Sequence, residues 1–305
     1  MQVFVTGATG FIGTAVVREL IDAGHQVLGM ARSDAGEEAL RAQGAEVHRG
    51  DLHDLESLRQ GAAKADGVIH LAFIHDFSKF QENCEIDRRA VEALGSTLAG
   101  SDRPFIITSG IGMANAGSGQ VATENDVTVS SKIISRAASE EAAAATAAAG
   151  GRVIVMRLPQ VHDKVKQGLI TYVIQVAREK GVSAYVGEGR SRWCAAHLFD
   201  TAHLYRLALE KGRAGATYHA VAEEGVSFRE IAEVIGRGLK VPVVSLKPEE
   251  AQGHFGWLAM FAGWDRPASS AQTRQQLGWN PKGPSLIADL NAMKYFDIDA
   301  MSVHR

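Results

Sequence analysis

The feature that most constrains how this chain folds is a glycine-rich stretch close to its first residue. A short apolar run, at positions 3–5, is typical of a buried strand, and the letters TGATGFIG follow it directly. From Ile12 to Ile21, apolar residues recur at steps of three and four, which predicts a helix. Residues 26–31 form a second apolar run and predict a second strand. This order of strand, glycine turn, helix and strand predicts a doubly wound α/β fold.

The three glycines of this stretch have the spacing of a phosphate-binding turn. Gly7 allows the chain to turn tightly, Gly10 allows a pyrophosphate to approach the backbone, and Gly13 allows the helix to pack close to the strand. The N–H groups at the start of the helix, together with the positive end of its dipole, then hold the anion. The sequence therefore predicts a dinucleotide cofactor, bound by residues of this turn: Gly7, Thr9, Gly10, Phe11, Ile12 and Gly13.

The residues after the second strand indicate which dinucleotide is bound. A site for NAD places a carboxylate there, which accepts a hydrogen bond from the ribose 2′-hydroxyl. Here the chain has Arg32 and Ser33, with no acid before Asp34. A guanidinium can bind a 2′-phosphate through two parallel hydrogen bonds. We therefore predict NADP as the cofactor, with NAD less favoured. The alternative is that Arg32 is a solvated arginine of the loop.

Strand and helix patterns alternate through the first half of the chain. Such alternation predicts a Rossmann-type doubly wound parallel sheet with helices on both faces, and ligands at the carboxyl ends of its strands. Since His70 lies inside a buried run, we expect it to be a core histidine with satisfied hydrogen bonds. Further strands are expected at 45–48, 67–71, 104–108 and 152–157, and helices at 37–43, 55–60 and 80–98.

The second half of the chain predicts a smaller C-terminal lobe that would bind the substrate. We assign residues 1–160, together with about 195–222, to the cofactor-binding domain, and residues 161–194 and 223–305 to this lobe. The stretch 254–267 is rich in aromatic and apolar side chains, which could cover a hydrophobic substrate or pack between the two lobes. Candidate walls of the substrate pocket are Trp193, Phe255 and Trp257.

Composition excludes several classes of function. The 305 residues carry a net charge of −3 and no basic block, so nucleic-acid binding is not expected. Cys84 and Cys194 are too few for a disulfide framework, and the N-terminal apolar run is too short for a signal peptide or a membrane span. No spacing of possible ligands indicates a metal site, and TSGIG lacks the pattern of a serine-hydrolase elbow. We expect a cytoplasmic protein that binds no metal and no membrane.

Seven blocks follow one another along almost the whole chain. They are TGATGFIG, GDL at 50–52, VIHLAF at 68–73, IITSG at 106–110, RLPQVH at 157–162, AAHLFDTAHLYRLAL at 195–209 and LGWNP at 277–281. In this order they resemble the extended and atypical short-chain dehydrogenase/reductases, the NAD(P)-dependent epimerase/dehydratase group. A glycine motif alone is shared by many families, whereas the ordered series is far more specific.

The resemblance implies roles for residues at the ends of the strands. It implies that Ser109, after the fifth strand, hydrogen-bonds the reacting oxygen of the substrate. It also implies that the long helices at about 80–98 and 131–149 form a homodimer. The cofactor contacts it implies are Asp51 and Leu52 for the adenine, Leu71, Ala72 and Phe73 for the sugars, and Pro159 and Val161 for the nicotinamide.

The chain departs from this family at the catalytic pair Tyr-x-x-x-Lys, because no tyrosine lies between positions 71 and 161. In one alignment, Thr128 takes the place of the tyrosine and Lys132 keeps the place of the lysine. In the other, which we prefer slightly, Glu140 matches a glutamate of the family. Lys132 then takes the place of the tyrosine and Arg136 that of the lysine.

Lys132 holds a catalytic position in both alignments. A helix predicted from position 130 or 131 to about 149 would place Lys132 and Arg136 one turn apart on one face. A lysine beside an arginine has a lowered pKa, so we predict Lys132 as the general acid with Arg136 as its neighbour. His75, after the fourth strand, and His162, where the family has a tyrosine, are alternative proton donors and candidate substrate contacts.

The prediction for the whole chain is an NADP-dependent oxidoreductase that transfers a hydride to a carbonyl, or from a secondary alcohol, of a small molecule. One alternative is a sugar-nucleotide epimerase or dehydratase, which would retain its cofactor without net turnover. Another is a regulator that senses NADP and catalyses nothing, and the missing tyrosine is the main support for it.

Overall fold

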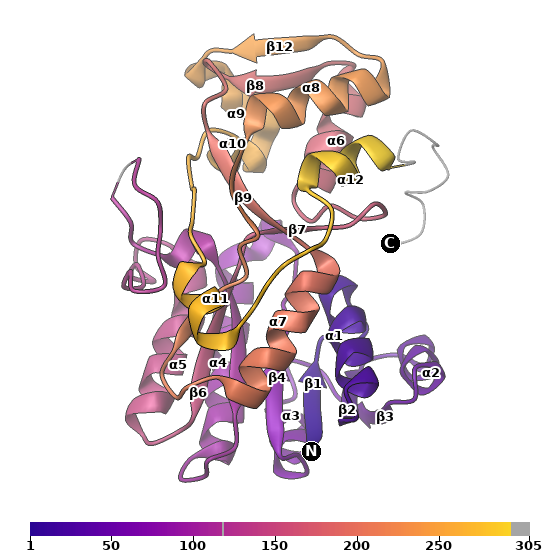
Figure 1. The fold of residues 1–305 in the computed structure, drawn as a ribbon, viewed down its shortest axis with the longest axis vertical. Helices are drawn as coiled ribbons and strands as arrows, with labels where there is room; N and C mark the ends of the chain where they lie inside the picture. Colours follow the sequence, from indigo (N-terminus) through magenta and orange to yellow (C-terminus); the bar gives the residue numbers. More distant parts are fainter. Residues whose placement is uncertain (118, 294–305) are drawn as a thin grey trace.

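The computed structural model describes residues 1–117 and 119–293, so the last residues of the predicted C-terminal lobe lie outside it. A parallel sheet of seven strands organises the described chain, in the order β10-β6-β5-β4-β1-β2-β3 (Figure 1). From β1 the successive strands are added first on one side, as β2 and β3, and then on the other side, starting with β4. Doubly wound folds bind their ligands at this switch between β1 and β4. The strands are β1 (Gln2–Thr6), β2 (Gln26–Ala31), β3 (Glu46–Arg49), β4 (Gly67–His70), β5 (Phe105–Gly110), β6 (Val153–Leu158) and β10 (Thr217–His219).

Helices cover both faces of this sheet, which confirms the predicted Rossmann-type class. On one face, α1 and α7 pack together over an apolar core that includes Val16, Leu20 and Tyr205. On the other face, α3, α4 and α5 pack over a second core that includes Phe4, Leu58 and Leu94. These elements are α1 (Phe11–Asp22), α2 (Asp34–Ala42), α3 (Leu55–Ala63), α4 (Phe80–Leu98), α5 (Ala138–Ala148), α7 (Leu198–Lys211) and α11 (Ala271–Leu277).

A smaller lobe sits beyond the carboxyl edge of the sheet (Figure 1). It has its own apolar core, in which Trp193 packs on Phe228 and Phe255 is only 3 % exposed. No helix in the described part of the chain has the length and apolar character needed to cross a membrane. The lobe contains strands β7 (Gln160–His162), β8 (Ser183–Val186), β9 (Arg192–His197), β11 (Glu223–Ser227) and β12 (Val243–Leu246), and helices α6 (Ile170–Lys180), α8 (Phe228–Leu239), α9 (Ala251–Phe255), α10 (Ala259–Ala262) and α12 (Leu286–Ala292).

The predicted helix at about 131–149 is wrong at its start. The α-helix begins at Ala138, after a short 3₁₀ turn at Ser135–Ala137, and Lys132 lies in a turn before both. The Ser131 N–H and hydroxyl both donate to the carboxylate of Glu141, so this segment folds back over the first turn of the helix. Serines bond nearby backbone groups and favour helix ends over helix interiors, and the Ser130 hydroxyl accepts a hydrogen bond from the Lys132 N–H in this turn. Lys132 and Arg136 therefore do not share a helix face.

Candidate active site

The glycine turn is packed so closely that side chains would not fit. Gly7 has a φ of +66°, and a Cβ there would lie 2.7 Å from the backbone nitrogen of Ala72, at the end of β4. A Cβ on Gly13 would lie 1.9 Å from the Gly7 carbonyl oxygen. Helix α1 starts after Gly10 with no side-chain cap and no acid in its first turn. Its N–H groups are thus available to an anion, and the turn fits the pyrophosphate of a dinucleotide.

Arg32 lies in a shallow pocket at the end of β2, together with Arg49, Gly50, Asp51 and Asp54. Its side chain is 72 % exposed, and its guanidinium is 3.8 Å from the Asp51 carboxylate, which is a loose pair. Arg49 is instead held at 2.7 Å by two carboxylates, those of Asp34 and Glu37.

The neighbouring Ser33 is the N-cap of α2, where its hydroxyl oxygen accepts a hydrogen bond from the Gly36 N–H. Arg32 is therefore the arginine of this pocket that remains available to a phosphate, and Ser33 fixes the start of the helix beside it. Leu52, predicted to contact the adenine, is buried in the core under α3.

A buried polar chain connects β1 to the start of α5. The Thr6 hydroxyl shares a hydrogen bond of 2.7 Å with His70 Nδ1, and His70 Nε2 lies 3.0 Å from Asp87. The other Asp87 oxygen accepts a hydrogen bond from Arg136 at 2.9 Å. Burial raises the pKa of Asp87, but the charge of Arg136 and the contacts of His70 and Ser139 outweigh it and hold that pKa below its ordinary value. His70 is therefore a core histidine with satisfied hydrogen bonds, as predicted.

Arg136 is fixed by the protein on several sides. Besides Asp87, its guanidinium donates to the Thr108 carbonyl at 2.7 Å and to the Ser139 hydroxyl, and it lies 4.6 Å from the centre of the Phe73 ring. Phe73 follows β4 in the segment that is expected to pack against the sugars of the cofactor. Arg136 thus places a positive charge at the carboxyl edge of the sheet.

Ser109 lies next to a second buried ion pair. Arg157 donates to Glu140 at 2.8 Å, and the Thr128 hydroxyl donates to the same carboxylate. Burial raises the pKa of Glu140, but its bonds with Arg157, assisted by Ser109 and Thr128, lower it further than burial raises it. The Ser109 oxygen is buried and lies near the Glu140 carboxylate. It makes no hydrogen bond of ordinary length and angle with Glu140 or with any other described residue. Thr128 is thus committed to structure, whereas the buried Ser109 hydroxyl has no ordinary hydrogen-bond partner in the described part of the chain.

The three candidate proton donors lie in different surroundings. Lys132 is exposed, and its ammonium forms no hydrogen bond or ion pair within the described chain. His162 is fully buried, with Nδ1 2.8 Å from Asp289 of α12, so the structure does not present it to a substrate.

His75 is exposed and lies edge-on between the rings of Phe73 and Phe77. Desolvation by the surrounding protein and the charge of Arg136 lower the pKa of His75, although the exposed part of the ring limits this effect. Among the three candidates, His75 is the one that combines access with a site at the carboxyl edge of the sheet.

An aromatic cluster joins the two lobes beside His75. Phe77 stacks on Trp257 at 4.1 Å, and Tyr172 of α6 stands edge-on to both rings. Trp257 remains 42 % exposed, so its predicted place in the wall of a substrate site stays a prediction that its exposure allows. Trp193 belongs instead to the core of the smaller lobe, and Phe255 belongs to that core while also lining the pocket described below. Sequence analysis missed Phe77 and Tyr172; the aromatic spacing of FIHDFSKF after β4 is the signal for Phe77.

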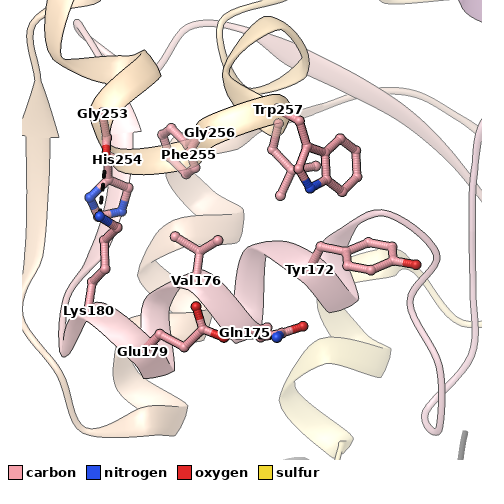
Figure 2. Close-up of a pocket in the computed structure, with 11 residues that line it drawn as sticks. Tyr172, Gln175, Val176, Glu179, Lys180, Gly253, His254, Phe255, Gly256 and Trp257 are labelled. Carbon is pink, nitrogen blue, oxygen red and sulfur yellow. Dashed lines mark hydrogen bonds between the residues drawn. The ribbon is translucent and has the colours of Figure 1, made fainter. Parts of the chain in front are cut away.

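A pocket of about 330 Å³ lies between α6 and residues 253–258. Figure 2 shows Gln175, Glu179 and Lys180 along one wall, and Lys180 donating to the Gly253 carbonyl. Tyr172 and Trp257 line one end of it. These two rings belong to the aromatic cluster as well, so a ligand in this pocket would contact the cluster.

Comparisons with known proteins find relatives of this chain and solved proteins that share its fold. An uncharacterized protein of Schizosaccharomyces pombe is 46 % identical over 297 residues, which cover 97 % of this chain and 100 % of that protein. A sterol-4-alpha-carboxylate 3-dehydrogenase (decarboxylating) of Dictyostelium discoideum is 29 % identical over 75 % of this chain and 74 % of its own length. A dTDP-glucose 4,6-dehydratase of Streptomyces venezuelae, solved with NAD, shares the fold, with a TM-score of 0.77, 19 % identity and 98 % coverage of both chains.

The family model for the NAD dependent epimerase/dehydratase family matches residues 3–222 of this chain. That match spans the glycine turn, all seven strands of the large sheet, and the residues from Arg32 to Val161 that surround the expected cofactor. The chain therefore belongs to the NAD dependent epimerase/dehydratase family, whose members use NAD(P).

Proposed function

We propose that this protein is an NADP-dependent oxidoreductase, acting on a carbonyl or a secondary alcohol of an apolar small molecule. The observation that carries the proposal is the pair formed by the exposed His75 and the unpartnered Ser109 hydroxyl. His75 follows β4, and Ser109 is the second-last residue of the neighbouring strand β5, at the edge of the sheet where this family holds the nicotinamide. A hydrogen-bond donor and a proton-exchanging group at one edge are what carbonyl reduction requires.

The cofactor, when bound, would supply or accept the hydride. The uncapped start of α1 would hold its pyrophosphate, and Arg32 would bind its 2′-phosphate, which supports NADP over NAD. Ser109 would hydrogen-bond the substrate oxygen, and His75 would exchange the proton at that oxygen. His75 replaces Lys132 as the favoured donor because Lys132 is separated from Arg136 by the turn described above.

An apolar substrate is supported by the aromatic cluster of Phe77, Tyr172 and Trp257, which stands beside His75. The Dictyostelium relative, by its name, acts on a sterol 4-alpha-carboxylate, a large and mostly apolar molecule that also carries a carboxylate. A sugar-nucleotide epimerase or dehydratase has weaker support, because the solved proteins of that kind are under 25 % identical and share only the fold.

A non-catalytic NADP sensor is the second candidate. Arg136 is aligned with the catalytic lysine of the family, but its guanidinium already donates hydrogen bonds to Asp87, Ser139 and the Thr108 carbonyl. These bonds favour a structural role for Arg136. Absorbance of NADPH, followed with a panel of apolar ketones, aldehydes and 3-oxo acids, separates the two candidates. Steady consumption with any substrate supports the oxidoreductase. Tight NADPH binding without consumption across the panel would replace it with the sensor.

A further inference from the structure

We infer that Lys166, which the smaller lobe contributes, is a pyrophosphate-binding residue that closes over the glycine turn. This inference rests on the proposed binding of a dinucleotide. Lys166 belongs to the loop between β7 and α6, which lies above the N-terminal end of α1 (Figure 1). Its ammonium is 5.7 Å from the centre of the Phe11 ring, and Phe11 is the first residue of that helix.

The positive charges at the N-terminal end of α1 favour the binding of an anion there. A cation at the N-terminus of a helix is unfavourable, because the helix end carries a partial positive charge of its own. Helix α1 nevertheless has no acid in its first turn, and Lys166 forms no ion pair with any carboxylate of the described chain. The neighbouring Asp163 carboxylate accepts hydrogen bonds from the backbone N–H groups of Val165 and Lys166 instead. A bound pyrophosphate would neutralise both positive groups at once.

The loop that carries Lys166 is held in place before any ligand binds. Gln160 donates to the Gln167 carbonyl and accepts from the Leu169 N–H, and Gln167 is itself fully buried and donates to the Asp163 carbonyl. Gly168 has a φ of +49°, and a Cβ there would lie 2.7 Å from the Gln160 amide nitrogen. A rigid loop loses little conformational freedom on binding, so the lysine is preorganised.

The charge of Lys166 also reaches the proposed proton donor. Its charge is among the influences that lower the pKa of His75, after desolvation and Arg136. The smaller lobe would thus contribute to the cofactor site as well as to the substrate site.

Binding measurements with the full chain test this role without relying on turnover. Fluorescence titration of Lys166→Met should show that its affinity for NADPH and its affinity for NADH both fall by about tenfold at low salt. A loss of this size is expected when one charge-assisted contact is removed. The affinity for 2′-AMP, which lacks the pyrophosphate, should not change. The matched control is Lys164→Met, which removes an exposed lysine from the same loop and should stay within about twofold of the wild type.

Salt dependence gives a second readout, since the loss caused by Lys166→Met should shrink as ionic strength rises. NADPH affinity of Lys166→Met within about twofold of the wild type, in a chain that binds NADPH, overturns the inference and leaves the proposed function intact. Equal weakening of 2′-AMP overturns it too, because the effect would then not lie at the pyrophosphate. A wild type that binds no dinucleotide overturns both.

Discussion

The Asp87 carboxylate lies 2.9 Å from the Arg136 guanidinium in a place where the aspartate is only 1 % exposed. This pair links helix α4 to the start of α5, and His70 extends it to β4. Removing one partner of a buried pair leaves an uncompensated charge, which is far more destabilising than losing a surface contact.

Asp87→Asn should therefore lower the free energy of unfolding by roughly 3 kcal/mol, measured by urea denaturation at neutral pH. Asp102→Asn is the matched control, since that carboxylate is 95 % exposed and 3.7 Å from Arg152; it should change the free energy by less than about 0.5 kcal/mol. Similar values for the two variants would mean that the Asp87–Arg136 pair contributes no more than a surface pair.

The same pair predicts a dependence on pH. Because the pKa of Asp87 is lower folded than unfolded, its contribution is present above the unfolded value, about 3.9, and is lost as the pH falls through the folded value. The difference in unfolding free energy between wild type and Asp87→Asn should thus shrink below about pH 4. A difference that stays constant into acid would show that the charge of Asp87 does not matter.

Arg32 should determine the choice between the two dinucleotides. Arg32→Ala removes the guanidinium proposed to bind the 2′-phosphate, so NADPH affinity should fall about ten- to a hundredfold while NADH affinity changes little. Isothermal titration at low ionic strength measures both. Arg59→Ala on α3, whose guanidinium pairs loosely with Glu56, controls for the loss of one positive charge. A wild type with equal affinity for the two cofactors would contradict the assignment of NADP.

These residues show what the sequence could and could not predict. The glycine turn and α4, whose bounds match the prediction, follow from local patterns of apolar residues and glycine. The start of α5 does not, because Ser131 finds its partner in Glu141, ten positions on. His162 is buried by Asp289, which is 127 positions away. Contacts over such distances leave no mark in a single sequence, and for that reason the sequence misplaces Lys132 and His162 but not His75.

His75 should carry the proton transfer. His75→Ala should lower kcat/KM by about 10²–10⁴-fold with cofactor affinity unchanged, whereas Lys132→Met should keep most of the activity. The lowered pKa of His75 gives a direction to the pH profile. Alcohol oxidation needs the neutral ring, so its rate should rise with pH and reach a plateau once the pH exceeds the pKa of His75, which is lower than 6.5. Carbonyl reduction needs the protonated ring, so its rate should increase as the pH falls. Loss of activity in Lys132→Met but not in His75→Ala would restore the lysine as the donor.

Dimerisation through α4 and α5 remains a proposal, and the structure indicates which alanine tests it. Ala142 is buried against α4, so an arginine there would disturb the fold of the monomer itself. Ala144, Ala145 and Ala148 are exposed and form a surface of small side chains on which a second copy could pack closely. Ala145→Arg would place a long charged side chain in such an interface and should convert a dimer into monomers at micromolar concentration.

Sedimentation velocity reads out the assembly, and circular dichroism shows whether the variant is folded. Ala39→Arg, at an exposed position of α2 on a different part of the surface, is the control and should leave the dimer intact. A wild type that sediments as a monomer removes the proposal altogether. If instead Ala145→Arg stays dimeric while folded, the two copies meet elsewhere, because an interface of small residues excludes a buried, unpaired guanidinium.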